Sequence, residues 1–332
     1  MIRFWLILNW NACIAPNLLT TPMKKAVFEK YGNTEVLKII ESDIPAIRQN
    51  EVLVKVEAAA LNPKDILVRK GKFKQFTGKK FPQSIGFDFS GRIENANGSE
   101  FPEGSEVFGM VNGWNGRCCA EYINVNKHEL YLKPKNISFE DAAGVPLAAQ
   151  TALQGIRDQG KLKSGQSILI NGASGGVGTL AIQIAKAFGG KVTTISSTKN
   201  QDFCTSLGAD TTLSYQEIQV PDLTDRYDVF FDVFGNYSFK KVSHLLTSKG
   251  IYVSTVPNAE IIKEQLFNPL RRKKAKLVVV RSNTRDLQWL GEQILQSGIK
   301  PITDKIFPLE QIGDAQAYIE TKRAKGKVIL KP

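Results

Sequence analysis

The chain has 332 residues, of which 42% are hydrophobic and 23% charged, and its formal net charge is +12. This composition is typical of a soluble globular protein and excludes a low-complexity chain. Two domains are expected, because single hydrophobic cores stop growing at about 250–300 residues. The positive charge fits a polyanionic cofactor as well as it fits a nucleic acid or another anionic partner.

Residues 1–22 do not share the pattern of the remaining chain, and we predict that they form a disordered extension. The apolar run Phe4–Leu8 is too short to cross a bilayer, and Asn9 interrupts it. A basic residue before this run leaves a weak secretory signal open, and an upstream start is the other alternative.

From Met23 to about Val145 the sequence is rich in β-strand signals. Glu51–Glu57 alternates as a half-buried strand does, and Gly, Pro and Asn punctuate the segment at short intervals. This pattern predicts a partly open β-barrel rather than a parallel sheet. Lys70–Lys80 mixes lysines with phenylalanines, and we interpret it as an exposed loop with apolar anchors; the rim of a cleft is the alternative.

The chain has four cysteines and two histidines. The cysteines show no Cys-x-x-Cys spacing, and the neighbours Cys118 and Cys119 do not suit an ordinary disulfide, so reduced thiols and a cytoplasmic location are expected. His128 stands among charged residues, and His244 lies in a predicted helical run. Neither position suggests a ligand, so no metal site is predicted.

The most informative stretch is a glycine-rich turn between a buried strand, Ser167–Asn171, and an apolar-spaced helix, Thr179–Phe188. This order indicates a dinucleotide site, because such a turn brings backbone close to a pyrophosphate at a helix N-terminus. Gly175 would allow that approach, Gly178 would let helix pack on strand, and Ala173 replaces the usual first glycine. A structural loop is the alternative. The predicted cofactor contacts in this turn are Ala173, Ser174, Gly175, Gly176, Val177 and Gly178.

From Ala149 onward, strand and helix signals alternate, which predicts a doubly wound parallel sheet. The tail returns to a different element, with a helix at Ile312–Thr321 and a closing strand at Gly326–Leu330. After the extension we therefore expect three parts, residues 23–148, 149–282 and 283–332. After the glycine turn the predicted strands are Lys191–Ser196, Thr212–Ser214, Asp228–Asp232, Ile251–Ser254 and Leu277–Val280, and the predicted helices are Asn200–Leu207 and Phe239–Leu246.

Short motifs follow one another along almost the whole chain: Leu61-Asn62-Pro63-Lys64-Asp65, Gly86 to Gly91, Ala142 to Pro146, Thr151 to Gln154, Gly172 to Gly178, Leu207 to Asp210 and Gly326 to Val328. As a set, they make the chain from Met23 to Pro332 resemble the quinone oxidoreductase-like branch of the medium-chain dehydrogenase/reductase superfamily. It is most similar to enone and quinone reductases of the chloroplast-envelope and mitochondrial types. The resemblance implies an α/β fold, with a GroES-like, partly open barrel as catalytic domain, a Rossmann parallel sheet, and a cofactor in the cleft between them.

The resemblance also implies that the chain works without zinc. Zinc-dependent alcohol dehydrogenases of the superfamily place a Cys where this chain has Asn62, and a His-Glu pair where it has Phe87-Asp88. Their four-cysteine structural zinc lobe is missing too. Without those ligands tetrahedral zinc has no site, so metal-free hydride transfer is expected.

The segment after the second Rossmann strand predicts the cofactor. NAD-dependent enzymes usually carry an acid there, whereas this chain has Ser196–Lys199 and no acid before Asp202. Hydroxyls and an ammonium hold a 2′-phosphate that a carboxylate would repel, so NADPH is the predicted cofactor. An ordinary polar loop is the alternative. By similarity, the further cofactor contacts are Ser197, Lys199, Tyr215 and, on a preceding helix, Thr151.

Asn62 is the first candidate for a polar contact near the nicotinamide, because it replaces a metal ligand. Together with Asp65 and Arg69 it makes up the candidate catalytic residues on a polar wall of the cleft. Asp65 and Arg69 stand four residues apart, and we expect them to form an ion pair that braces this wall, with a direct catalytic role as the alternative. No residue is required as a general base, since solvent or a nearby hydroxyl supplies the proton. Phe87, with a phenylalanine of Lys70–Lys80, either lines an apolar substrate pocket or packs in the core.

We therefore predict a zinc-independent oxidoreductase that transfers hydride from NADPH to a quinone or an α,β-unsaturated carbonyl compound. A homodimer is expected through the sheet edge near Leu277–Val280. Two other classes stay open: nucleic-acid binding through the basic surface, which the intact glycine turn disfavours, and a non-catalytic, peripheral membrane role through Phe4–Leu8 and basic loops. The basic run Arg271–Lys274 is interpreted as a solvated loop, with phosphate or membrane contact as the alternative.

Overall fold

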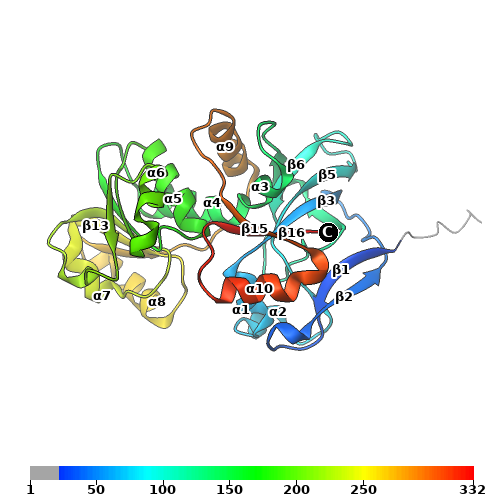
Figure 1. Ribbon diagram of the computed structural model, residues 1–332, viewed down its shortest axis with the longest axis horizontal. Helices are drawn as coiled ribbons and strands as arrows, with labels where there is room; N and C mark the ends of the chain where they lie inside the picture. Colours follow the sequence, from blue (N-terminus) through cyan, green and yellow to red (C-terminus); the bar gives the residue numbers. More distant parts are fainter. Residues whose placement is uncertain (1–21) are drawn as a thin grey trace, which may run out of the picture.

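The computed structural model describes residues 22–332 and arranges them as two units side by side (Figure 1). The predicted extension, residues 1–22, lies outside the described residues except for Pro22. Within residues 22–332, no helix is long and apolar enough to pass through a membrane. Cys118, Cys119 and Cys204 are buried and unbridged, as predicted.

The first unit is the predicted barrel, and the last strands of the chain complete it. It contains β1 (Met23–Phe28), β2 (Leu37–Ser42), β3 (Glu51–Leu61), α1 (Pro63–Arg69), α2 (Lys74–Thr77), β4 (Gln83–Ser84), β5 (Asp88–Asn95), β6 (Glu106–Met110), β7 (Tyr122–Asn126), β8 (Leu130–Leu132), α3 (Phe139–Ala143), β15 (Thr303–Pro308) and β16 (Lys327–Lys331). One sheet has the order β15-β16-β3-β5-β6-β8 with β7 on β3, and a smaller one has the order β2-β1-β4.

Strand β3 shows why the barrel forms and how it reaches the site. Residues 54–57 alternate as the sequence predicts, with Lys55 exposed between two buried valines, but Leu53 is buried as well, so the alternation is confined to that part of the strand. The strand then continues through a buried stretch of small residues to Leu61, where both neighbouring strands still pair with it. It therefore delivers the next residue, Asn62, to the inner end of the sheet.

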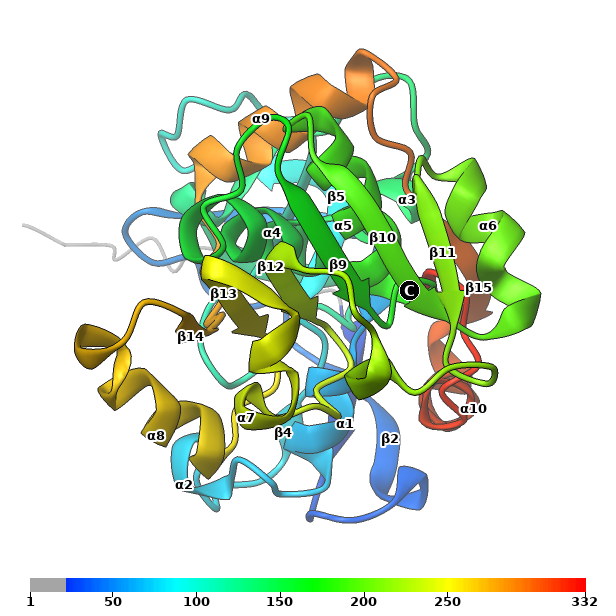
Figure 2. The ribbon, with the colours of Figure 1, turned by 90° about the vertical axis from the view of Figure 1, so that its left-hand side faces the viewer.

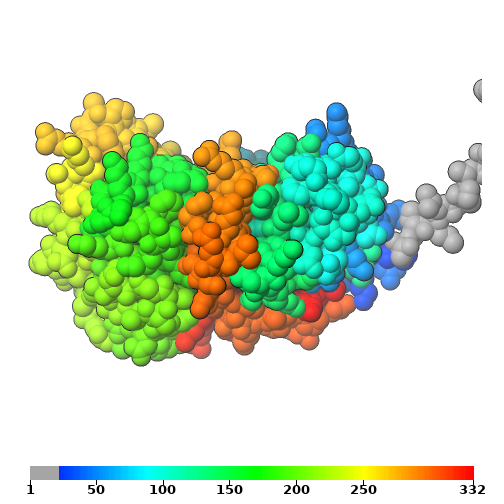
Figure 3. Space-filling view, turned by 90° about the horizontal axis from the view of Figure 1, so that it is seen from above, coloured from blue at the N-terminus to red at the C-terminus, as the bar shows by residue number. Residues whose placement is uncertain are grey.

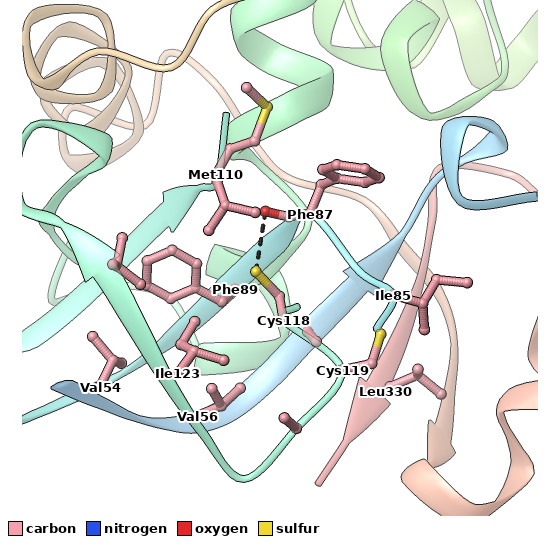
Figure 4. Close-up of a cluster of buried hydrophobic side chains, with 14 of the residues drawn as sticks. Val54, Val56, Ile85, Phe87, Phe89, Met110, Cys118, Cys119, Ile123 and Leu330 are labelled. Carbon is pink, nitrogen blue, oxygen red and sulfur yellow. Dashed lines mark hydrogen bonds between the residues drawn. The ribbon is translucent and has the colours of Figure 1, made fainter. Parts of the chain in front are cut away.

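The barrel core gathers buried side chains from β1, β3, β5, β6, β7, β8 and β16 and from the segments between them, and Figure 4 shows part of it. Phe87 and Phe89 are fully buried in it, and the Cys118 thiol donates a hydrogen bond to the Phe87 carbonyl at 3.2 Å. Burial raises the pKa of both Cys118 and Cys119, so these thiols are neutral packing groups.

The segment Lys70–Lys80 is mostly exposed and has apolar anchors, as the sequence predicts. Phe73 and Phe76 both lie 4.7 Å from the Trp114 ring, and the neighbouring Phe81 packs edge-on against Tyr31. The departure from the prediction is the short helix α2, which replaces part of the loop. The ring contacts hold the segment on the barrel.

The second unit is the predicted parallel sheet flanked by helices (Figure 2). Its elements are α4 (Pro146–Leu153) with a π-helical extension (Gln154–Gln159), β9 (Ser167–Asn171), α5 (Gly176–Ala187), β10 (Lys191–Ser196), α6 (Gln201–Ser206), β11 (Thr211–Ser214), β12 (Tyr227–Asp232), α7 (Phe239–Val242), β13 (Leu246–Ser254), α8 (Ala259–Leu266), β14 (Lys274–Leu277) and α9 (Thr284–Leu295).

The strand order is β11-β10-β9-β12-β13-β14, and all neighbouring pairs are parallel. This is a doubly wound sheet whose order reverses between β9 and β12. Ile168 and Ile170 face the core under α4, α5 and α9, whereas Leu169 faces the core under α7 and α8. Both faces are covered, which explains the short apolar runs of the central strands β9 and β12.

Two predicted elements of this unit have wrong bounds. The helix expected over Phe239–Leu246 ends at Val242, and Leu246 already begins β13. The strand expected at Leu277–Val280 is Lys274–Leu277, so the edge strand carries two lysines in place of an all-apolar run. Apolar spacing located the elements but not their ends, because the true strand is amphipathic.

The basic run before this edge is not simply solvated. Arg271 pairs with Glu264, while the Lys273 and Lys274 ammonium groups donate to backbone carbonyl oxygens. Arg272 is exposed. The run therefore closes the turn between α8 and β14, which corrects its interpretation as a solvated loop.

The last segment ties the two units together. Helix α9 lies between them (Figure 3) and packs on α4 and β8. Helix α10 (Ile312–Glu320) packs on α1 and β16, close to its predicted bounds, and β16 inserts between β15 and β3. Just before β16, Gly326 forms a parallel bridge with Gly175 of the Rossmann sheet's first turn.

Candidate active site

The glycine turn (residues 172–178) follows β9 at the position where the strand order reverses, which is where open parallel sheets bind ligands. A Cβ on Gly178 would lie 2.2 Å from the Gly172 carbonyl oxygen, so only glycine permits this approach of helix to turn. A Cβ on Gly175 would meet nothing closer than 3.6 Å. The turn is thus closed on its inner side and open at Gly175, the N-cap of α5.

Gly176 leaves room for the last strand of the chain, β16. A Cβ there would lie 2.9 Å from Cδ of Lys327, whose stem passes the turn beside Gly144. The Gly326 N–H donates to the Ser174 carbonyl at 3.3 Å, which holds the strand against the turn. A side chain at position 176 would therefore displace Lys327.

Lys327 reaches a buried polar group that we call the polar wall, formed by Asn62, Asp65, Asp88 and Lys327. The Lys327 ammonium donates to Asn62 Oδ1 and, at 3.1 Å, to Asp88 Oδ2. The Asn62 amide nitrogen donates to the same Asp88 oxygen at 2.9 Å. The side chains of Lys327 and Asp88 are only 6% and 0% exposed, so this ion pair is shielded from water.

Asp88 also connects the wall to the second unit. Its other oxygen accepts the backbone N–H of Leu147 at 2.7 Å, in the first turn of α4. A carboxylate is favourable at a helix N-terminus. Burial nevertheless raises the pKa of Asp88, while Lys327 and Asn62 act in the opposite direction.

Asp65 braces the wall through backbone groups. It accepts the N–H of Asn62 at 2.7 Å and the N–H of Gly86 at 2.9 Å. Complete burial raises the pKa of Asp65 to about 6, although both backbone hydrogen bonds lower it. Asp65 therefore fixes the turn that positions Asn62.

The predicted ion pair between Asp65 and Arg69 does not form. The Arg69 guanidinium points away, pairs with Glu320 and donates to Gln316 and the Gly32 carbonyl. Four-residue spacing brings two side chains to one helix face, but α10 supplies better partners for Arg69. Arg69 therefore anchors α10 on α1 and is not part of the polar wall.

The residues that are predicted to contact the cofactor phosphate lie just after the ends of two adjacent strands, β10 and β11. Ser197 follows β10, Lys199 is exposed two residues later, and Tyr215 follows β11, where its N–H donates to the Ser196 carbonyl at 3.1 Å. Asn200 connects this region to the glycine turn, because its amide donates to Ser174 Oγ at 3.0 Å. The Asn200 amide oxygen is buried and has no protein partner within the described residues.

The other predicted residues lie nearby but are committed to protein contacts. Thr151 is buried on α4, and its hydroxyl donates to the Leu147 carbonyl at 2.7 Å. Phe87 belongs to the barrel core, as one of the two open interpretations has it, and the Lys64 ammonium lies 3.7 Å from its ring centroid. Trp114, next to Phe73 and Phe76, is the partly exposed aromatic group closest to Lys64.

Comparisons with known proteins agree with this architecture. Residues 48–135 match the alcohol dehydrogenase GroES-like domain, and residues 207–330 match the zinc-binding dehydrogenase family. The chain is 37% identical over 324 residues to a chloroplastic NADPH-dependent alkenal/one oxidoreductase of Arabidopsis thaliana, covering 93% of this chain and 80% of that protein. It is 36% identical to 2-methylene-furan-3-one reductase of Solanum lycopersicum, with coverage of 95% and 80%.

A solved structure gives the same result. The quinone oxidoreductase of Coxiella burnetii superposes with a TM-score of 0.86 at 30% identity, over 94% of this chain and all of that one. The chain belongs to the quinone oxidoreductase-like branch of the medium-chain dehydrogenase/reductase superfamily. The fold of this superfamily implies two bound groups, a nicotinamide dinucleotide and zinc.

The residues of this medium-chain reductase fit a dinucleotide. The opening at Gly175 and the N-terminus of α5 provide backbone N–H donors for a pyrophosphate. The orphaned oxygen of Asn200 suits a ribose hydroxyl, and exposed Lys199 suits a phosphate. These groups lie at the carboxyl ends of neighbouring strands, as a bound dinucleotide requires.

The same residues do not fit zinc. Within residues 22–332, no three His, Cys, Asp or Glu side chains are grouped to hold a metal ion. At the positions that the resemblance assigns to ligands, the chain offers an amide (Asn62), a phenyl ring (Phe87) and a carboxylate (Asp88). That carboxylate already binds the Lys327 ammonium, and a second cation there would be repelled.

Sequence reasoning missed three polar residues of this medium-chain reductase: Asp88, Asn200 and Lys327. Asp88 and Lys327 lay inside the motifs that carry the resemblance, but no site role was assigned to them. The available signal was a charged residue at the start of an otherwise apolar strand, as in Asp88–Phe89 and Lys327–Leu330. Asn200 had no such signal, because its importance depends on where Ser174 lies.

Proposed function

We propose that the chain is an NADPH-dependent reductase of α,β-unsaturated carbonyl compounds or quinones that works without zinc. The observation that carries the proposal is the placement of the polar wall directly against the glycine turn, through Lys327 and Gly176. The relatives named for alkenal/one and quinone reduction support the substrate class. The polar wall gives the reacting end of a bound dinucleotide a charged and largely dry surrounding.

The preference for NADPH follows from the end of β10. Ser197 and Lys199 offer a hydroxyl and an ammonium, and no acidic residue stands there before Asp202. Asp202 lies beyond the turn, in the first turn of α6. An adenosine 2′-phosphate therefore meets positive charge rather than a carboxylate.

Bound NADPH would supply the hydride, and the chain's own residues bind, orient and shield the reactants. Backbone N–H groups at the start of α5 hold the pyrophosphate, and Gly175 leaves room for it. Asn62 does not offer a free donor, because its amide nitrogen already donates to Asp88 and to the Ala60 carbonyl. Asn62 instead fixes the direction of the Lys327 ammonium, and no side chain is assigned as general base.

The proposal extends to assembly. We infer a homodimer that forms at β14, the edge strand of the Rossmann sheet, whose outer backbone groups have no partner strand within the described residues. Sedimentation velocity of the purified chain tests this inference, with a monomer at micromolar concentration contradicting it. The cytoplasmic location and peripheral membrane contact stay predictions.

The test of the main proposal is a substrate panel. Purified protein is mixed with NADPH and, separately, with short and long enones, enals, saturated aldehydes and quinones, and NADPH absorbance is followed. Enones or quinones should consume NADPH, saturated aldehydes should not, and exhaustive chelation should leave the rate unchanged. Absence of turnover with every conjugated acceptor, or activity that requires added zinc, would contradict the proposal.

A further inference from the structure

The side chain of Lys327 runs from the glycine turn to the polar wall. Its stem passes Gly144 and Gly176, and its ammonium ends between Asn62 and Asp88. The residue before it is bridged to the glycine turn. One side chain therefore contacts both the segment that would hold the cofactor and the wall that would face the substrate.

Asn62 connects the start of α1 to this arrangement. It is the N-cap of α1 and forms a capping box with Asp65, whose carboxylate accepts the Asn62 N–H at 2.7 Å. The Asn62 side-chain oxygen also accepts from Lys327, and its nitrogen donates to Asp88. The first turn of α1 therefore fixes the residue that directs the Lys327 ammonium.

Stability alone does not explain the buried pair of Lys327 and Asp88. Desolvation of two charges offsets most of their attraction, and apolar replacements of similar volume are often equally stable. The stem of Lys327 nevertheless joins this pair to the glycine turn, where Gly326 bridges Gly175 and the stem passes Gly176. Reduction of a conjugated carbonyl or a quinone develops negative charge on the substrate oxygen, and a fixed cation at this place would stabilise that charge.

We propose that Lys327 is a positioning residue of the reductase, which holds a fixed positive charge beside the glycine turn where zinc-dependent relatives hold a metal. The proposal rests on the proposed function. Asn62 and Asp88 direct the ammonium, which has three N–H donors of which these two residues take two. The chemical step depends on this charge, whereas cofactor affinity depends mainly on the turn.

The first experiment removes the positive charge of Lys327 and keeps an unbranched side chain in its place. Lys327→Met should lower kcat for the best substrate of the panel by about 100-fold, the loss typical of one electrostatic group. The NADPH dissociation constant, measured by fluorescence without substrate, should change less than about threefold. The kinetic isotope effect with 4-deuterated NADPH should rise, because the chemical step becomes slower than product release. Lys327→Arg should recover part of kcat, since it restores the charge.

The decisive variant removes both charges together. Lys327→Met with Asp88→Asn eliminates the unpaired carboxylate that the single variant leaves behind, so a folding defect should be relieved. If kcat stays low in this double variant, Lys327 acts on the reaction. If kcat returns to the original value, Lys327 only neutralises Asp88, and the proposal is wrong.

A matched control lies on the same strand. Lys331 also pairs with a carboxylate, Glu140, but its side chain is 55% exposed and it stands at the opposite end of β16 from Lys327. Lys331→Met should leave kcat and the isotope effect unchanged. If the original protein reduces no member of the panel, the proposed function fails; if it does and Lys327→Met is equally fast, only the present inference fails.

Discussion

The two sides of the candidate site are constructed in different ways. The glycine turn presents backbone N–H groups from one continuous segment, and close approach of helix and turn fixes its shape. The polar wall presents buried charges from three segments that lie far apart in sequence. A site made of backbone is sensitive to added volume, whereas a site made of buried charges is sensitive to the loss of a partner.

The largest effect is expected in the wall, from Asp88→Ala. This change leaves the Lys327 ammonium buried without its carboxylate and removes the acceptor of the Leu147 N–H. Urea unfolding should show a loss of about 3–5 kcal/mol. Glu29→Ala, which breaks the exposed pair with Lys38, is the control and should cost no more than about 1 kcal/mol. Equal losses for the two variants would mean that the wall does not depend on charge pairing.

The wall should also give the stability curve a pH dependence through Asp65. Its folded pKa of about 6 lies above the ordinary 3.8, so protonation favours the folded state. This contribution is complete below about pH 4 and is lost as the pH rises through 6, by about 3 kcal/mol. Unfolding free energies of the original protein and Asp65→Asn, measured from pH 4 to 7, should therefore diverge, with the original protein losing stability relative to the variant. A constant difference across that range would refute the assignment.

Two substitutions in the glycine turn distinguish an effect on packing from an effect on cofactor binding. Gly178→Ala places a Cβ 2.2 Å from the Gly172 oxygen and should cost about 1–3 kcal/mol of stability. Gly175→Ala places a Cβ in ordinary van der Waals contact, 3.6 Å from the Gly172 oxygen, so its melting temperature should fall far less than that of Gly178→Ala. It should still raise the NADPH dissociation constant by roughly 10-fold, because the methyl group occupies the approach of the pyrophosphate. An unchanged affinity in Gly175→Ala would move the cofactor away from this turn.

The smallest effect is expected from substitutions just after β10, where we predict contact with the 2′-phosphate. Ser197→Asp combined with Lys199→Ala replaces a hydroxyl and an ammonium by a carboxylate beside the expected 2′-phosphate. The KM for NADPH should rise roughly 10-fold, which corresponds to about 1.4 kcal/mol, and the rise is no larger because water screens the contact of the exposed Lys199. The KM for NADH should change little. Steady-state kinetics with both cofactors measures this split. Equal shifts for the two cofactors would show that these residues do not contact the phosphate.

The same contrast explains what the sequence could and could not predict. The turn between β9 and α5 is local, so residue types at fixed spacing identified it, and the alternation of strands and helices identified the sheet. The wall is not local: the partners of Asn62 lie on β5 and at the start of β16. Arg69 shows the limit most clearly, because helical spacing paired it with Asp65, whereas α10, distant in sequence, provides its actual partners.

The separation of Lys327 from Asn62 by 265 residues has a consequence for biosynthesis. A ribosome adds about 5–20 residues per second, so on the order of 10–50 s pass between the emergence of the two residues. Throughout that interval Asp88 lacks its ammonium, and the first Rossmann turn lacks the strand that docks on it. The nascent polypeptide can shape the barrel strands and the parallel sheet early, but the joint between them is completed by one of the last segments to be translated.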